Sequence, residues 1–475
     1  MTPSTTTSSA SPTAYRMRPS IISIVVVVIL ALACWLGATA SWRSFAALMG
    51  GVAGVAILRQ PRLGPLVLII IALALPITFS TGTDVRLNPA AVFVPVLFVL
   101  WGLGALVRGA LHAPSSPVNL PLLLFLLGGL VSLGVGLVTW DPLVPRRESF
   151  IIVQLAQWAI FVFSAMAFWL TAILAQDGRW LSRITVVFLV VGGFLALLRV
   201  VPLLRPVFDV VTTGAVDRAP FWLLLGALAG GQLLFNRGLH FTGRIALLAI
   251  LAITAYYAFF LEREGASTWV GVAVAWAVLG WLRFPRWRAS LVVILLLLTG
   301  VGLLFPVLWE FAGGDAEWLL SGESRLILIE RVLEVTMRNP LLGLGPAAYR
   351  VYASWQPLVM AGSRLWLGSV VSSHNNYVDL FAHGGAVGLA LFAWFVAAYA
   401  RVAFSLRRRH RTGFAAGYVN AMLAAGAGAL VIMLLADWML PFVYNIGFHG
   451  FQASVLVWLF LGGIVALEHM PETRG

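Results

Sequence analysis

The chain has 475 residues, of which 61% are hydrophobic and only 10% are charged, whereas an ordinary soluble domain carries about 25% charged residues. All 31 basic residues are arginine, and the formal net charge is +13. The arginines stand mostly in short clusters between apolar runs, which is the pattern of a membrane protein and argues against nucleic-acid binding. The single cysteine, Cys34, excludes a disulfide framework and a cysteine-based metal cluster.

Apolar runs that can cross a bilayer recur along most of the chain, after a Ser-, Thr- and Pro-rich start at 1–19 that we expect to be a disordered cytoplasmic tail. A helix needs about 20 apolar residues to span the hydrocarbon core. The fourteen candidate spans are 20–40, 44–58, 63–80, 89–107, 118–138, 150–175, 182–201, 220–236, 244–261, 266–282, 289–308, 376–403, 413–436 and 446–467. The short, glycine-rich segment 44–58 is the weakest. The sequence therefore predicts an all-α polytopic membrane protein with about 14 (12–14) transmembrane helices.

The distribution of arginine predicts the orientation. With the N-terminus in the cytoplasm and strict alternation of spans, the inner segments hold 18 of the 31 basic residues but only three of the 18 acidic ones. Membrane proteins carry their excess of arginine and lysine in cytoplasmic loops. We therefore expect both termini, including the tail 469–475, to be cytoplasmic.

One segment outside the membrane is large: the loop 309–375, which separates the N-terminal spans (20–308) from three C-terminal spans (376–468) and lies on the outer side. Within it, Ser321 to Arg338 has helical periodicity. Its apolar face consists of Leu326, Ile329, Leu333 and Met337, and its polar face of Arg325, Glu330, Arg331, Glu334 and Arg338. Asn339-Pro340 ends the pattern. We predict an amphipathic helix at the outer surface, followed by a Gly-Leu-Gly-Pro turn at 343–346.

Three polar clusters at the outer ends of spans are candidates for chemistry. The first is Arg263, which stands between Glu262 and Glu264 at the junction of two spans. Charge at that depth is costly unless it is paired or functional. Arg263 either pairs with its neighbouring glutamates in a helix corner, or faces an outer cavity and binds an anion.

The second candidate is Arg325, which opens the amphipathic helix. An arginine in a first helical turn opposes the helix dipole, but it has a purpose if an anion binds to the free N–H groups there. The alternative is a solvated surface arginine paired with Glu323.

The third candidate is His374, which precedes Asn375 and Asn376 at the start of a span. Either asparagine can cap that helix. The positive end of the helix dipole favours a neutral imidazole, which can take a proton from a hydroxyl. The alternative is an interfacial histidine that serves as a cap. His383, more than two turns deeper, is better explained by packing.

Together these stretches resemble the signature region of the O-antigen ligase and O-antigen polymerase superfamily. The matching elements are Ser324-Arg325, the run from Asn339 to Gly345, His374-Asn375-Asn376-Tyr377 and the glycine-rich run from Gly384 to Gly388. Upstream, Arg263 to Ala266 is similar to the family's junction between two spans, with Glu262 where serine is common. The resemblance covers about 130 residues by motif, and the remainder by the layout of many spans, a large outer loop and three final spans.

This resemblance implies a membrane glycosyltransferase of the GT-C type in a bacterial plasma membrane. Such enzymes transfer a glycan from an undecaprenyl-pyrophosphate carrier at the outer face to a hydroxyl of a glycan, glycolipid or protein, with inversion and without a cofactor or metal. The resemblance implies that Arg263 and Arg325 bind the pyrophosphate, because arginine forks match phosphate oxygens. His374 then is the general base on the acceptor hydroxyl, or positions that hydroxyl. Weaker candidates for glycan or supporting contacts are Asn375, Tyr377, Arg350, Arg364 and Asp379.

Other functions fit parts of the pattern. A repeat-unit polymerase or a protein O-glycosyltransferase of the same superfamily shares these motifs and differs in its acceptor. A secondary transporter or lipid flippase also has a dozen or more spans, but such proteins often show inverted repeats and charges near the membrane midplane, whereas the polar clusters here lie at outer span ends. A peptidoglycan polymerase uses an acidic residue in a large outer loop, where Asp315 and Glu317 stand in different surroundings.

Overall fold

A computed structural model of the chain describes residues 51, 54–82, 85–109, 114–302, 304–314, 323–355, 358–360, 363–365 and 371–470. The expected tail 1–19, the predicted span 20–40 and most of the predicted span 44–58 lie outside the described residues. The chain divides into two compact units, residues 1–61 and 62–475. The elements below belong to the second unit.

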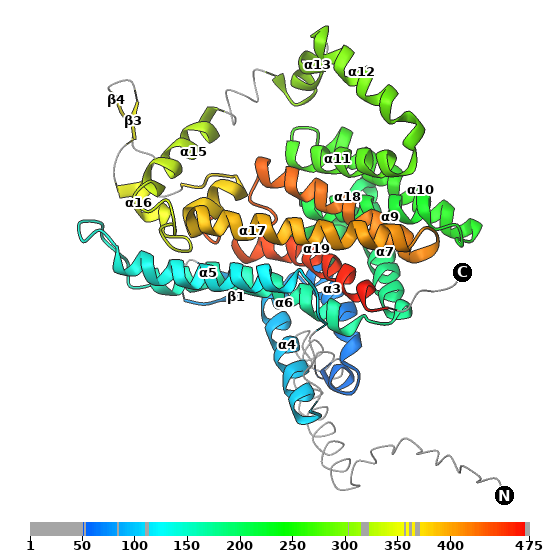
Figure 1. The fold of residues 1–475 in the computed structure, drawn as a ribbon, viewed down its shortest axis with the longest axis horizontal. Coiled ribbons are helices and arrows are strands. Elements are labelled where there is room, and N and C mark those ends of the chain that lie inside the picture. Colours follow the sequence, from blue (N-terminus) through cyan, green and yellow to red (C-terminus); the bar gives the residue numbers. More distant parts are fainter. Residues whose placement is uncertain are drawn as a thin grey trace, which may run out of the picture. The chain divides into compact units, whose positions relative to one another are not determined.

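The second unit is built almost entirely from helices (Figure 1). In chain order the α-helices are α3 (Gly64–Ala74), α4 (Pro89–Val107), α5 (Asn119–Val138), α6 (Phe150–Leu174), α7 (Gly178–Val200), α8 (Arg205–Val211), α9 (Ala219–Phe235), α10 (Phe241–Tyr256), α11 (Ala266–Arg283), α12 (Arg288–Gly300), α13 (Leu304–Phe311), α15 (Glu323–Thr336), α16 (Tyr349–Trp355), α17 (Asn376–Arg409), α18 (Gly413–Leu435) and α19 (Gly447–Glu468). Short helical turns are η2 (Pro202–Leu204), η3 (Gly214–Asp217), the π-helical η4 (Tyr257–Leu261) and η5 (Pro285–Trp287). Strand β1 (Phe79–Ser80) pairs antiparallel with β2 (Arg86–Leu87), and β3 (Leu358–Met360) with β4 (Ser363–Leu365).

Nine helices of the described chain are long and apolar enough to cross a membrane: α4, α5, α6, α7, α10 with η4, α11, α17, α18 and α19. The protein is therefore an all-α polytopic membrane protein. Each of the nine occupies a segment that the sequence predicts as a span. Two further predicted spans, 63–80 and 220–236, contain the shorter apolar helices α3 and α9.

The core of the bundle lies around α19, of which 94% of the apolar stretch is buried. α19 packs on α6 and α9, α18 packs on α9 and α11, and α17 packs on α5 (Figure 1). A helix that is hydrophobic on all sides is expected to be enclosed in this way. Small residues permit the close approach: a side chain at Gly231 of α9 would overlap with Gly417 and Ala421 of α18.

The predicted span 289–308 does not form one straight helix. α12 and α13 meet there at an angle of 85°. Between them Gly302 has a left-handed φ of 75°, a conformation that glycine adopts at low steric cost. No residue of α12 is buried, which suits a helix that faces lipid.

The two glycine-rich motifs of the sequence meet at a break in α17. The helix loses its regular path at Gly385, where φ is 64°, and the N–H of Ala386 donates instead to the carbonyl of Pro340 at 2.8 Å. A side chain at Gly385 would overlap with the carbonyl of Leu341, and one at Gly343 would overlap with the α17 backbone. Glycine is therefore required at both positions, and the contact joins the large loop to α17 near the start of that helix.

The predicted amphipathic helix is α15, at the end of the bundle beside α16 (Figure 1). The prediction that Arg331 lies on the polar face is wrong, because its side chain is only 1% exposed. Arg331 donates hydrogen bonds to the carbonyl of Ala353 at 3.3 Å and to Glu334 at 2.6 Å. From the expected apolar face, Leu326 and Met337 are 53% and 62% exposed. The packing of α15 on α16 and α17 decides which face is buried, and helical periodicity alone does not contain that information.

Candidate functional site

A cavity of about 580 Å³ opens where α15 begins. Its wall comes from segments far apart in sequence: the start of α9, the junction of η4 with α11, the end of α13, the start of α15, the residue before the α17 cap, and the loop between α18 and α19. The polar side chains that line it are Asp217, Arg218, Glu262, Glu264, Ser267, Thr268, Arg325, His374, Asp437 and Asn445.

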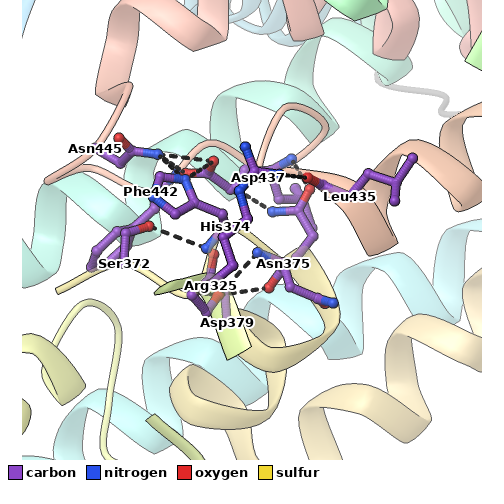
Figure 2. A network of polar contacts seen from close by, with 12 residues as sticks. Arg325, Ser372, His374, Asn375, Asp379, Leu435, Asp437, Phe442 and Asn445 are labelled. Carbon is purple, nitrogen blue, oxygen red and sulfur yellow. Dashed lines mark hydrogen bonds and ion pairs between the residues drawn. The ribbon is translucent and has the colours of Figure 1, made fainter. Parts of the chain in front are cut away.

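His374 lies at the junction of the large loop and α17. Its φ is 49°, in the left-handed region that histidine visits more often than most residues. Its Nδ1 is 3.2 Å from Nδ2 of Asn445 and 4.0 Å from Oδ1 of Asp437 (Figure 2). The side chain is 34% exposed, so the imidazole is partly shielded from water and still accessible from the cavity.

Asp437 is the carboxylate behind the imidazole, in the loop between α18 and α19. It is 2% exposed. Its two oxygens accept hydrogen bonds from Nδ2 of Asn445 at 3.0 and 3.1 Å, and Oδ2 also accepts from the N–H of Phe442 at 3.3 Å. A buried carboxylate needs such partners to remain charged. His374, Asp437 and Asn445 together form what we call the His–Asp–Asn cluster.

Burial dominates the titration of this cluster. The pKa of His374 lies below its ordinary value because burial penalises the imidazolium; the Asp437 carboxylate opposes this shift and the Arg325 guanidinium adds to it. The pKa of Asp437 lies above its ordinary value, again because burial penalises the charged form. A neutral imidazole is expected at neutral pH. The largest of these causes is burial, which the sequence did not reveal.

Asn375 anchors the start of α17. Its Oδ1 accepts from the N–H groups of Tyr377 and Val378 at 2.9 and 3.2 Å, so Asn375 is the cap of the helix. Its Nδ2 donates to the carbonyl of Leu434 near the end of α18 at 3.0 Å. The capping asparagine therefore also joins two helices.

Asn376, fully buried, fastens the loop that carries Asp437. Its Oδ1 accepts from the N–H groups of Met439 and Leu440. Because Asn376 follows His374 by two positions, the same short motif fixes both the imidazole and the segment that supplies its carboxylate partner.

Two arginines line the cavity with His374. Arg325 donates from Nη1 to the carbonyl of Leu435 at 3.3 Å, at the C-terminal end of α18, where the helix dipole favours a cation. Arg218, directly before α9, lies over the ring of Trp438 at 4.7 Å. The side chain of Glu323, the alternative partner of Arg325, lies outside the described residues.

Arg263, expected to bind the pyrophosphate, does not line the cavity. Its neighbours Glu262 and Glu264 line it instead. Arg263 is exposed. No ion pair within the described part of the chain joins Arg263 to either glutamate, so the paired corner is not found either.

Two of the weaker candidates, Tyr377 and Asp379, make hydrogen bonds that stabilise the structure around His374. The hydroxyl of Tyr377 donates to the carbonyl of Leu430 in α18 at 2.8 Å. Asp379 is buried, and its Oδ1 accepts from the hydroxyls of Tyr349 and Ser373 at 2.8 and 2.7 Å. Asp379 therefore ties the large loop to α17 directly beneath the residues around His374.

The remaining candidates lie elsewhere. Arg350 in α16 lies over the ring of Tyr444 at 4.1 Å and lines a second cavity. Arg364 belongs to β4, and its side chain lies outside the described residues. His383 is buried, and its Nδ1 accepts from the N–H of Ala347 at 3.2 Å, which agrees with the packing role expected for it.

Sequence reasoning missed Arg218, Asp437 and Asn445. The sequence could have indicated Asp437 as a candidate, because it is an acidic residue at the end of an apolar run, where charge is costly. The contact between Asn445 and His374 joins positions 71 residues apart. No periodicity or local motif contains information about such a contact.

Among the described residues, no three His, Cys, Asp or Glu side chains gather closely enough to hold a metal ion. Comparison of the chain with protein-family models and with curated proteins finds no match. The function must therefore be argued from the chemistry of the cavity and from the motifs that line it.

Proposed function

We propose that this protein is a membrane glycosyltransferase of the GT-C type, with about 14 spans, at the outer face of a bacterial plasma membrane. It transfers a glycan from an undecaprenyl-pyrophosphate carrier to an acceptor hydroxyl. The observation that carries the proposal is that His374, backed by Asp437, lines one cavity together with Arg325 and Arg218. The resemblance of the surrounding motifs to the O-antigen ligase and polymerase superfamily supports the choice of substrates.

The reaction is a displacement at the anomeric carbon of the donor sugar. The acceptor oxygen forms a bond to that carbon while the carbon's bond to the pyrophosphate oxygen breaks, and the configuration inverts. The acceptor's proton passes to the imidazole of His374, and the electron pair of the broken bond leaves with the pyrophosphate. Proton transfer to a positioned side chain contributes typically ~10²–10⁴-fold to the rate.

This role requires that the proton of neutral His374 be on Nδ1, so that Nε2 is free to accept. The other tautomer accepts a hydrogen bond from Asn445 at Nδ1 and keeps its proton on Nε2. The Asn445 contact at 3.2 Å favours this second tautomer, so the proposed role requires Nδ2 of Asn445 to turn away from Nδ1. The Asp437 carboxylate, 4.0 Å from Nδ1, then attracts the proton there and stabilises the imidazolium formed during the reaction.

Arg325 and Arg218 supply positive charge for the leaving group. Guanidinium groups bind phosphate oxygens in a bidentate manner. Their charge stabilises a developing anion most strongly when it is already in position. The Leu435 carbonyl holds Arg325, and the ring of Trp438 holds Arg218.

The acidic residues of the same cavity suit the glycan of the donor. Glu262 and Glu264 line the cavity at the start of α11. Sugar hydroxyls donate hydrogen bonds to carboxylates, whereas a carboxylate repels a pyrophosphate. The glycan therefore binds toward α11, and the pyrophosphate binds toward Arg218 and Arg325.

The test is glycan transfer by the purified protein in nanodiscs. The donor is an undecaprenyl-pyrophosphate oligosaccharide, offered with glycan, glycolipid and peptide acceptors, in the presence and absence of EDTA. We expect transfer by the wild type and a loss of ~10²-fold or more for His374→Ala. His240→Ala, which changes an exposed histidine at the start of α10, is the matched control and should retain the wild-type rate.

The acceptor that is modified separates a ligase from a repeat-unit polymerase or a protein O-glycosyltransferase. The proposal is wrong if the wild type modifies no acceptor and instead moves a lipid-linked glycan or another solute across proteoliposomes with the His374→Ala variant equally active. That result would identify a flippase or transporter.

A further inference from the structure

A second cavity, of about 250 Å³, adjoins the first. Asn445 and Ile446 line both cavities. The rest of its described wall comes from Val85 and Arg86 at β2, from Arg350 in α16, from Val443 and Tyr444 in the loop before α19, and from the start of α19. Because Nδ2 of Asn445 also contacts Nδ1 of His374, a molecule in the second cavity is separated from the proposed base by a single side chain.

The second cavity differs from the first in its charge. Arg86, Arg350 and His449 line it, and none of its described lining residues is acidic. The first cavity contains four carboxylates, from Asp217, Glu262, Glu264 and Asp437. Two cavities that share a wall therefore present opposite balances of charge, and an anionic group is favoured in the second.

The two arginines of the second cavity come from different elements of the fold. Arg350 lies over the ring of Tyr444 at 4.1 Å, and stacking of this kind fixes the plane of a guanidinium. Arg86 is exposed and belongs to β2, which the pairing with β1 holds in place. No ion pair of Arg86 occurs among the described residues.

We propose that this second cavity is the acceptor subsite, and that it binds a phosphate or carboxylate group on the sugar that receives the glycan. The proposal rests on the proposed function. Its volume is below the ~300–1,000 Å³ of pockets for drug-sized ligands, which fits one charged sugar residue and not a long glycan. An acceptor whose anionic group is held by Arg86 and Arg350 extends past Asn445 and Ile446, which line both cavities, into the first cavity. There its hydroxyl meets Nε2 of His374 beside the donor.

The first experiment measures binding without any transfer. Glucose 1-phosphate, glucuronate and uncharged glucose are titrated onto the protein in nanodiscs by saturation-transfer NMR. We expect the two anions to bind more tightly than glucose. Arg86→Gln and Arg350→Gln should each weaken anion binding by about tenfold, since hydrogen bonds between charged groups are roughly twice as strong as neutral ones. Arg205→Gln, an exposed arginine in α8 that does not line this cavity, is the matched control.

The second experiment measures transfer to paired acceptors with and without the anionic group. We expect Arg86→Gln and Arg350→Gln to raise the KM for the anionic acceptor and to leave the KM for the donor unchanged. Unfolding temperatures equal to the wild type's would show that the variants fold. If the wild type transfers glycan and these variants keep the wild-type acceptor KM, the subsite is wrong and the proposed function stands.

Failure of the proposed function and failure of the anionic subsite give different results. If anions bind through Arg86 and Arg350 but the wild type transfers nothing, the proposed function fails, and with it the assignment of the cavity to an acceptor. If glucose and glucose 1-phosphate bind equally well, the anionic subsite itself is overturned.

Discussion

The side chain of Asn376 is bonded to the backbone of Leu440, 64 positions further along the chain. Its Nδ2 donates to the Leu440 carbonyl at 2.8 Å, and its Oδ1 accepts from the Leu440 N–H at 3.2 Å. Asn376 stands two positions after His374, and Leu440 stands three positions after Asp437. One buried amide therefore sets the spacing between the proposed base and its carboxylate partner, so its removal should affect both stability and activity.

Asn376→Ala removes these bonds and leaves buried backbone groups of Leu440 without a partner. Each unsatisfied buried group costs about 1–3 kcal/mol. We expect a lower free energy of unfolding and a loss of transfer of up to ~10²-fold in the fraction that remains folded, because small misplacements of catalytic groups are costly. Thermal unfolding and activity per folded protein measure the two effects. Asn236→Ala, which loses hydrogen bonds to Gln232 and Gly238 far from the cavity, is the control; equal behaviour of the two variants would show that Asn376 does not position the loop.

The pH dependence of transfer should report the environment of His374. A base acts in its neutral form, and the pKa of His374 lies below its ordinary value of 6.5. Activity should therefore persist below pH 6.5 and be lost as the pH falls through the lowered pKa. Asp437→Asn removes the charge that raises the pKa of His374. The acidic limb of the profile of activity against pH should therefore move to lower pH, and kcat should fall.

Arg325→Gln should move the same limb in the opposite direction, because the Arg325 guanidinium lowers the pKa of His374. Profiles of kcat/KM against pH for the wild type and both variants measure these shifts. Identical limbs in all three proteins would contradict the role of His374 as the titrating base.

The sequence was sufficient for the features that repeat or act locally. Apolar length predicts the nine long apolar helices of the described chain, because crossing a bilayer imposes a minimum number of apolar residues. The cap of α17 follows from the position of Asn375, because capping involves only the next three residues. The turn around Gly343 is likewise predicted by its glycines, although the need for Gly385 to meet it becomes clear only in the fold.

The sequence was not sufficient where tertiary contacts select between local alternatives. Arg263 and Arg218 both stand at the end of a span, yet only Arg218 lines the cavity. Helical periodicity assigns Arg331 to the polar face of α15, but packing against α16 buries it. The partnership of His374 with Asp437 depends on how two separate loops fold over the bundle, and neither loop has a motif that indicates the other.

The contact between the glycine motifs makes a prediction about stability. Gly385→Ala places a Cβ on a left-handed residue and against the carbonyl of Leu341, and strain of this kind costs on the order of 1–3 kcal/mol. Gly384→Ala is the control, because a Cβ there meets open space. We expect a lower unfolding temperature in detergent for Gly385→Ala only. A Gly384→Ala variant that is equally destabilised would show that the close approach is not the cause.

The arginines provide the sharpest contrast between the sequence and the fold. All three arginines are exposed, but Arg218 and Arg325 line the cavity of His374, whereas Arg263, which the motif resemblance favours, does not. Arg218→Gln and Arg325→Gln should each lower kcat/KM for the donor by roughly tenfold or more, since a charge-assisted hydrogen bond contributes about 1.5–3 kcal/mol and every 1.4 kcal/mol is a factor of ten. Arg263→Gln should stay within about twofold of the wild type, because Arg263 does not line the cavity and a surface charge away from the ligand usually contributes little.

Steady-state transfer with the donor varied at a saturating acceptor concentration measures all three variants. Sensitivity to salt should separate them further, because screening weakens the binding of a pyrophosphate to the arginines of the cavity. If Arg263→Gln is the damaging substitution and Arg218→Gln is silent, the donor pyrophosphate binds outside the cavity described here. The bond-breaking step would then have to be assigned to the exposed side of the turn between η4 and α11, beside Arg263.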